Sequence, residues 1–476
     1  MTTNTRRTFL KLAGLAPLAR FGAMNAFASS GVDPNYKALV CIFLFGGNDG
    51  NNMIVPAPGT SEYTAYKNIR GSLALPDPNA TLQGMTITPK TYVGPNKTPA
   101  YALNDGLKLV LPLWATGQLA AVANVGLLVQ PTTQAQYQAT ITGGPAVPLP
   151  SNLFSHADQQ VQMQAGIPSS SASTGWAGRV ADAVSSQNGA ASFPPSVSVA
   201  GPALFSKGNI VQSASLIPGF NMQLNGFTTW QPAVGQTRQT QYQSILTMNS
   251  GLTMIQAADK VRQDAVNLSA MLSSLPPASP FTRAFPQTDI GKQLQQVAQI
   301  MQLQPQLGLK RQIFFCSLGG FDTHSGQSWQ QYSLLGEIAD AMLSMYSATQ
   351  DLGIANQVTT FTESEFGRTL QPSGTGCDHG WGGHHLVLGG AVKGGDMYGR
   401  YPMMAVGGPD DCLSNSNPST PARGAWLPST SIDQFAATLG KWFGVDMTNP
   451  SVVAQTFPNL ASFTNAGLPA DLGFMS

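Results

Sequence analysis

Residues 38–52 read ALVCIFLFGGNDGNN. The unbroken apolar run 38–45 is closed by Gly46 and Gly47, and Asp49 follows two residues after Gly47. A continuous apolar run that ends in glycines is typical of a strand buried on both faces of a parallel sheet. Similar short runs predict further strands at 119–125, 196–199, 312–318, 357–362 and 403–406.

Helical patterns lie between these runs. Apolar residues recur near helical spacing over 107–114, 176–184, 240–272, 289–303, 330–352 and 432–443. Strands that alternate with helices predict an α/β fold, with a mostly parallel central sheet and helices on both of its faces. The length allows two domains, but we expect a single α/β domain over residues 29–476 with loop and helical insertions.

The N-terminus predicts export. Residues 5–11 read TRRTFLK, an apolar stretch follows over 12–19, and Ala26-Phe27-Ala28 matches a signal-peptidase site. We therefore expect residues 1–28 to be a twin-arginine signal peptide and the protein to be periplasmic or secreted; the alternative is an amphipathic helix of the domain. Twin-arginine export carries folded proteins, which favours a bound metal or cofactor. No later apolar run has the length of a membrane helix, so no membrane span is expected in the mature protein.

Charged residues make up 10% of the chain, against about a quarter in a typical globular domain. The chain has 24 basic and 23 acidic residues, and removal of 1–28 takes away four basic residues and no acid. The remaining 20 basic and 23 acidic residues give a formal charge of −3. Without clusters of Lys and Arg, no nucleic-acid partner is expected.

Four cysteines follow the predicted signal peptide. Cys41 and Cys316 lie in apolar strand-like runs and are expected to be buried free thiols. Cys377 and Cys412 lie in polar loops, and an oxidising compartment would allow them to pair. The absence of a C-x-x-C motif argues against a cysteine zinc site.

Histidines and carboxylates are concentrated in one part of the sequence. Four of the five histidines lie between 324 and 385, in the segments GGFDTHS (319–325) and CDHGWGGHH (377–385); a third segment, TESEFGRT (362–369), carries two glutamates. Two of these segments follow predicted strands directly, as Asp49 follows the first strand. Because functional groups gather beyond the carboxyl ends of parallel strands, we expect them at one rim. Imidazole with carboxylate is a ligand set for zinc, manganese or iron.

Each residue also has a plain structural interpretation. Asp322 and His324 could form an ion pair at a strand end, and Asp49 could stabilise an Asn/Gly-rich turn. Glu363 and Glu365 could serve only to pair with Arg368.

Two other positions are open. Ser155 could cap a helix over 157–165, which leaves the role of His156 undecided. His384 and His385 point apart if they lie on a strand, so both need not face the site.

These motifs resemble a bacterial family known as domain of unknown function 1501. The resemblance rests on FGGNDGNN (45–52), Ser155-His156, Gly175-Trp176, FDTHS (321–325), SEFGRT (364–369), DHGWGGHH (378–385) and GGAVKGG (389–395). That family is similar to the alkaline-phosphatase-like superfamily of phosphatases, sulfatases and phosphoglycerate mutases. The likeness implies an alkaline-phosphatase-like α/β fold with two adjacent metals and a Ser or Thr nucleophile.

The resemblance also implies a set of site residues. Metal ligands are expected at Asp49, Asp322, His324, Glu365, Asp378, His379, His384 and His385. Glu365 is included because it occupies the strand end where the superfamily places an aspartate. Asp322 and His324 are two residues apart, whereas the superfamily usually spaces its first Asp and His four residues apart. Ser155, or second Ser151, is the expected nucleophile, and Arg368 or Lys393 would neutralise developing charge.

The preferred function is an exported metal-dependent hydrolase of phosphate or sulfate esters, with one or two divalent ions, zinc or manganese. Its substrate would be a small-molecule or glycan ester. The alternative is a non-catalytic periplasmic binding or assembly protein that keeps the fold and whose Gln-, Ser- and Gly-rich surface would suit a carbohydrate or a protein partner. A redox protein that uses iron ranks last.

Overall fold

The computed structural model describes residues 33–76, 81–92, 94–189, 191, 193–218, 231–248, 280–415 and 421–476, with scattered residues between 251 and 266. The predicted signal peptide, 1–28, lies outside the described residues. The chain divides into two compact units, one of residues 1–216 with 281–476 and one of Ile217–Pro280. The smaller unit contains α8 (Pro232–Leu246), which overlaps the first part of the helix predicted over 240–272. The residues described between 255 and 266 are helical as well.

A nine-stranded sheet forms the centre of the larger unit, in the order β11-β5-β10-β9-β1-β8-β6-β7, with β12 also beside β5. Its strands are β1 (Lys37–Leu44), β5 (Leu119–Gly126), β6 (Ser196–Ser198), β7 (Ser213–Ser215), β8 (Arg311–Leu318), β9 (Val358–Glu363), β10 (Gly383–Gly389), β11 (Met397–Gly399) and β12 (Thr430–Ser431). The strand expected from the opening apolar run lies between β8 and β9 and is parallel to both; Val40 is opposite Phe314 and Thr360. Of the nine strands, β10 alone runs antiparallel to its neighbours.

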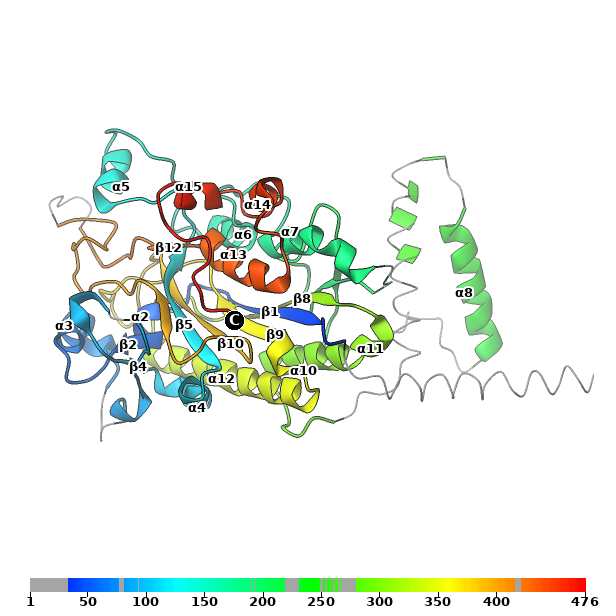
Figure 1. Cartoon of the computed structure of the whole chain (residues 1–476), viewed down its shortest axis with the longest axis horizontal. Coiled ribbons are helices and arrows are strands. Elements are labelled where there is room, and N and C mark those ends of the chain that lie inside the picture. Colours follow the sequence, from blue (N-terminus) through cyan, green and yellow to red (C-terminus); the bar gives the residue numbers. More distant parts are fainter. Residues whose placement is uncertain are drawn as a thin grey trace, which may run out of the picture. The chain divides into compact units, whose positions relative to one another are not determined.

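Helices cover both faces of this sheet (Figure 1). On one face lie α7 (Trp176–Ala183) and α13 (Ile432–Phe443), and on the other lie α10 (Asp289–Gln302) and α12 (Gln327–Asp351). The ring of Phe361 on β9 packs 5.7 Å from Phe435 of α13 and 5.9 Å from Trp176 of α7. The predicted α/β architecture, a mostly parallel sheet between helices, is confirmed.

Shorter elements complete the larger unit. The helices are α2 (Gly50–Met53), α3 (Ser61–Arg70), α4 (Leu111–Ala115), α5 (Gln134–Ile141), α6 (His156–Ala165), α11 (Gln304–Leu307), α14 (Pro450–Thr456) and α15 (Leu460–Thr464). A small second sheet has the order β2-β4-β3, with strands Ile54–Pro56, Tyr101–Leu103 and Thr86–Ile87.

Two details differ from the sequence expectations. Residues 403–406 form no strand; instead the backbone N–H of Met403 donates to Asp410 Oδ2 at 2.9 Å, so this apolar run follows a loop. The possible Cys377–Cys412 pair is not formed, and all four cysteines are buried free thiols. Arg70 Nη1 instead donates to Cys377 Sγ at 3.0 Å.

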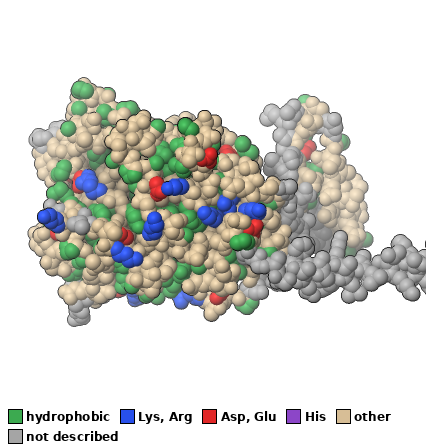
Figure 2. Space-filling view, viewed as in Figure 1, with side chains coloured by type: hydrophobic (Ala, Val, Ile, Leu, Met, Phe, Trp, Pro, Cys, Tyr) green, Lys and Arg blue, Asp and Glu red, His purple; other side chains and the backbone are tan. Residues whose placement is uncertain are grey.

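The surface agrees with the low charge content. In Figure 2 the basic and acidic side chains lie scattered over the visible face and do not gather into a basic patch. Among the described residues, no helix combines the length and apolar character needed to cross a membrane.

Candidate metal site

Three imidazoles converge on one carboxylate oxygen beyond the carboxyl edge of the sheet. Asp322 Oδ1 lies 3.1 Å from His324 Nε2, 3.3 Å from His156 Nε2 and 3.6 Å from His379 Nε2. We call these four residues the Asp322 cluster. They come from three separate segments: the loop after β8, the start of α6 and the loop before β10. Because β10 runs antiparallel, the loop before it lies at the same edge as the loop after β8.

Close backbone packing fixes Asp322. Gly46 follows β1 with a φ of +116°, and a Cβ there would lie 2.2 Å from the backbone nitrogen of Asp322. The neighbouring N–H of Phe321 donates to the carbonyl of Phe45 at 3.1 Å. Only glycine fits at position 46, because it accepts this φ and leaves room for the loop after β8.

Glu365 orients His156. Its Oε1 atom lies 2.9 Å from His156 Nδ1 and also accepts from Gly46 N at 2.8 Å and Gln160 Nε2 at 3.1 Å. The hydrogen bond to Glu365 outweighs partial burial and raises the pKa of His156. With its proton on Nδ1, neutral His156 turns the lone pair of Nε2 toward Asp322. That Nε2 atom is buried and has no hydrogen bond within the described chain.

The backbone of Phe154 orients His379 in the same way. His379 Nδ1 donates to the Phe154 carbonyl at 2.7 Å, so the Nε2 lone pair faces the cluster. Partial burial lowers the pKa of His379 and favours its neutral form. Phe154 has a φ of +71°, a conformation that costs a non-glycine residue about 1–3 kcal/mol and is typical of functional sites.

Asp378 lies at the rim of the cluster. Its Oδ1 atom is 3.5 Å from His324 Nδ1, and its Oδ2 atom accepts from Arg423. Arg423 also donates to the carbonyl of Pro372 at 3.0 Å. No local sequence pattern links Arg423 to Asp378, because the two residues are 45 positions apart.

Arg368 is buried and donates a hydrogen bond to Asp322. It is 1% exposed and donates to the carbonyls of Gly46 (2.6 Å), Gly47 (2.9 Å) and Cys377 (2.5 Å), and to Asp322 Oδ1. Partial burial tends to raise the pKa of Asp322, but Arg368 and the nearby histidines lower it. The expected contact of Arg368 with a substrate is therefore corrected to a positioning role.

Asp49 does not join the cluster. Its buried carboxylate pairs with Arg70, accepts from Gln327 Nε2, and caps α2 through Asn51 N at 3.0 Å. A buried guanidinium already neutralises this carboxylate, so the structure places Asp49 as a local anchor and not among the expected ligands.

His384 and His385 also lie apart from the cluster, on opposite faces of β10. His384 Nδ1 accepts from Asn124 N at 3.0 Å, and the His385 ring packs 5.9 Å from Phe435. Burial lowers the pKa of His384 to about 4 and that of His385 to about 3. Both imidazoles are neutral members of the interior, which corrects the expectation that they complete a metal site.

Ser155 and Lys393 complete the comparison with the expected residues. Ser155 immediately precedes His156, and its hydroxyl donates to Asp158 Oδ2 at 2.6 Å. The hydroxyl of Ser151 accepts from Gln162 Nε2 at 2.9 Å. Lys393 lies at the opposite edge of the sheet, since Gly394 N bonds the carbonyl of Gly117 just before β5. Lys393 is therefore excluded from the site.

The Asp322 cluster has the chemistry of a cation site. One ligand atom each from His156, Asp322 and His379 lies within 4.8 Å of the others. Two of the imidazoles aim lone pairs at a carboxylate oxygen, and His324 Nε2 is only 3.0 Å from His379 Nε2. Such a set is mutually repulsive unless a proton or a metal ion lies between the atoms. Imidazoles held through Nδ1 are the usual arrangement of metal-ligating histidines.

The fold and the site together define an α/β protein with a histidine–carboxylate cluster at the carboxyl edge of its sheet. The chain belongs to the family described as "Protein of unknown function (DUF1501)", whose model matches residues 36–417. No curated protein matches the sequence.

Two solved structures are similar in part. One is Ps i-CgsB in complex with k-i-k-neocarrahexaose, with 9% identity and a TM-score of 0.32, covering 91% of this chain and 77% of that one. The other is the PsFucS1 sulfatase from Pseudoalteromonas sp., with 9% identity and a TM-score of 0.29, covering 88% of this chain and 74% of that one.

Proposed function

We propose that the protein is an exported, metal-dependent hydrolase of phosphate or sulfate esters. The observation that carries the proposal is the convergence of three imidazole Nε2 atoms on Asp322 Oδ1, with two of the rings held through Nδ1. His156, Asp322, His324 and His379 would hold one divalent ion, zinc or manganese. When bound, the ion would polarise the ester and lower the pKa of a nearby water.

Other groups of the chain would bind and orient the anionic ester. Arg423, beside Asp378, is partly exposed and offers positive charge to the anionic ester at the rim. The helix α6 begins at His156, so its first N–H groups, which have no partner within a helix, lie beside the cluster. These groups would orient a phosphate or sulfate ester against the imidazoles.

Ser155 remains our candidate nucleophile. Its hydroxyl proton already points to Asp158, which could accept the proton as Oγ attacks phosphorus or sulfur and the ester oxygen leaves. Water would then release the anion and restore the hydroxyl. Hydrogen bonds from Ser155 and Asn152 lower the pKa of Asp158, which keeps this carboxylate ionised.

Export is proposed from the paired Arg6 and Arg7 and the Ala26-Phe27-Ala28 segment. A small-molecule or glycan ester is the proposed substrate. Cell fractionation of the unchanged chain and of a variant with Arg6→Lys and Arg7→Lys tests export. If both chains are found at full length in the cytoplasm alone, this part of the proposal is wrong.

The central test is elemental analysis of the purified protein together with turnover of aryl phosphates and aryl sulfates. Asp322→Asn should abolish both bound metal and turnover. Asp471→Asn, which alters an exposed carboxylate paired with Lys441 at 2.8 Å, is the matched control and should change neither. Absence of metal after supplementation with zinc and manganese would refute the metal site. Bound metal without turnover would favour the alternative, a binding or assembly protein.

A further inference from the structure

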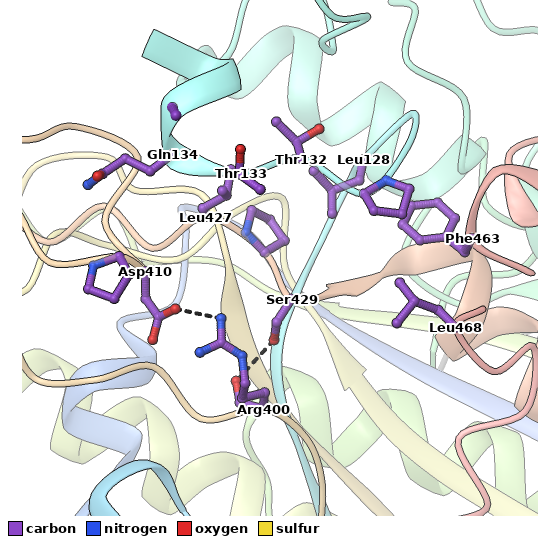
Figure 3. A pocket seen from close by; sticks show the side chains of 14 residues that line it. Leu128, Thr132, Thr133, Gln134, Arg400, Asp410, Leu427, Ser429, Phe463 and Leu468 are labelled. Carbon is purple, nitrogen blue, oxygen red and sulfur yellow. Dashed lines mark hydrogen bonds and ion pairs between the residues drawn. The ribbon is translucent and has the colours of Figure 1, made fainter. Parts of the chain in front are cut away.

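A separate cavity of about 510 Å³ opens at the carboxyl ends of β5 and β11 (Figure 3). Its walls come from Leu128, the stretch 131–135, Arg400, the pair 409–410, the stretch 427–429, and Phe463 with Leu468. Neither Asp322 nor any histidine lines it. The volume falls in the range of roughly 300–1,000 Å³ that is typical of small-molecule sites.

The topology places this cavity where parallel sheets commonly bind ligands. β11 pairs parallel with β5, Gly399 lying opposite Ala123, and Arg400 is the first residue after β11. Beyond Gly126, the last residue of β5, the chain continues through Leu127 to Leu128, which lines the cavity. Ligands of open α/β sheets bind beyond the carboxyl ends of their strands, which is the position of this cavity.

Arg400 provides unused hydrogen-bond donors. Its guanidinium donates through Nη2 to Asp410 Oδ1, and within the described chain this is its one hydrogen-bond acceptor. The Asp410 side chain is 2% exposed, and its other oxygen accepts from Met403 N at 2.9 Å. The Arg400 side chain is 54% exposed. Asp410 is therefore closed to a ligand, whereas Arg400 keeps N–H groups in a fixed orientation for an oxyanion.

The other walls combine hydroxyls with apolar surface. Ser429 Oγ donates to the carbonyl of Arg400 and Thr132 Oγ1 to that of Gln130, both at 3.0 Å. Both hydroxyls keep lone pairs that can accept from a ligand. Figure 3 shows Leu128, Phe463 and Leu468 across the cavity from Arg400 and Asp410.

We propose that this cavity binds an acidic sugar unit, independently of the proposed hydrolase activity. The carboxylate of the sugar would bind Arg400, its hydroxyls would donate to Thr132 and Ser429, and the C–H face of its ring would pack on Leu128 and Leu468. A neutral sugar lacks the group that Arg400 binds. An inorganic anion lacks the ring that the apolar wall covers.

The cavity shares a wall with the loop of the Asp322 cluster. Leu128, Leu427 and Phe463 belong to one buried apolar group with Trp381, which lies two residues after His379. Trp381 Nε1 also donates to the carbonyl of Leu127 at 3.0 Å. A ligand in the cavity would thus contact residues that pack directly on this loop.

Titration calorimetry of the full chain with glucuronate, glucose and inorganic sulfate tests the proposal. Glucuronate should bind saturably, with a Kd of about 1 mM, so that about 10 mM glucuronate nearly fills the site. Glucose and sulfate should each bind at least about tenfold more weakly, because each lacks one set of contacts. Saturable binding of none of the three, or glucose or sulfate binding as tightly as glucuronate, would overturn the proposal.

Variants locate the binding. Arg400→Gln should weaken glucuronate by about ten- to a hundredfold, as expected for loss of a charged hydrogen-bond pair. Arg283→Gln, which alters a half-exposed arginine paired with Asp340 at 2.6 Å, is the matched control and should leave binding unchanged. Arg400→Gln also removes the guanidinium that pairs with Asp410 and could disturb the local structure. A second variant, Leu468→Trp, keeps this ion pair and fills the cavity with a larger side chain. Unchanged glucuronate affinity in Leu468→Trp would place the binding elsewhere.

Discussion

The ring of His379 is held by the backbone of Phe154, whose carbonyl oxygen lies 2.7 Å from Nδ1. The two residues are 225 positions apart in the sequence, and the contact joins the loop before β10 to the start of α6. The carbonyl can reach the ring because Phe154 has a φ of +71°. Backbone strain at one residue thus sets the tautomer of a histidine in another segment, and with it the direction of the Nε2 lone pair.

Glu365→Gln should weaken metal binding without removing a proposed ligand. The amide cannot match the carboxylate that accepts from His156 Nδ1, and loss of such a supporting contact costs about 10–100-fold in metal affinity. Competition with a chromophoric chelator would measure the change. Glu337→Gln on α12 is the control, and equal affinities in the two variants would contradict the orienting role of Glu365.

Arg368→Met should destabilise the protein severely. The substitution leaves the carbonyls of Gly46, Gly47 and Cys377 without their donor, and each buried acceptor left unsatisfied costs about 1–3 kcal/mol. Asp322, whose side chain is 49% exposed, loses its guanidinium partner as well. Arg423→Met removes a partly exposed arginine and should cost less. Urea unfolding of both variants tests the order; similar midpoints would show that Arg368 does not hold the loops together.

His384→Leu and His385→Leu should have different effects on the free energy of unfolding, although the two residues are adjacent. Loss of His384 leaves the buried N–H of Asn124 without an acceptor, which costs about 1–3 kcal/mol. His385 has two buried ring nitrogens with no hydrogen bond within the described chain, so leucine there should be neutral or stabilising. Thermal unfolding distinguishes them, and an equal loss in both would count against this assignment.

Asp433 should give the protein a pH-dependent stability. Burial raises its pKa to about 6, although hydrogen bonds from Asn459 oppose the shift. Because the folded chain holds the proton more tightly than the unfolded chain, the free energy of unfolding falls as pH rises from about 4 to about 6, by up to about 3 kcal/mol. Asp433→Asn should remove this component. Urea unfolding at several pH values in this range measures the effect. If the midpoints of the unchanged protein and of Asp433→Asn change with pH in the same way, Asp433 is not the source of the pH dependence.

The fold could be predicted well because its strands are continuous apolar runs. Five of the six predicted strands appear as β1, β5, β6, β8 and β9 within one or two residues of their predicted ends. The strand β10 is not predicted from the sequence, because its residues GHHLVLG begin with two histidines, which are typical of metal ligands. Their burial depends on neighbouring strands and on α13, and none of that packing is visible in the local sequence.

The site could be predicted only in part for a similar reason. Asp322, His324 and His379 do come together, since each lies beside the end of a strand in this sheet. Asp49 also lies beside a strand end, but Arg70 occupies its carboxylate, and no local pattern links the two residues. The role of His156 cannot be predicted from the local sequence, because its contacts with Glu365 and Asp322 are made across more than 160 positions.

The reversed direction of β10 has a consequence for how this protein can vary. Since β9 and β10 are adjacent and antiparallel, residues 364–382 leave the sheet and return to it at the same edge, as an oversized hairpin loop. Both ends of the excursion join paired strands, and Arg368 binds its first part to the carbonyls of Gly46 and Gly47, so only the solvent-facing turn at 371–375 is open to changes in length. Evolution or an engineer could therefore vary this short turn and reshape the rim without redesigning the scaffold.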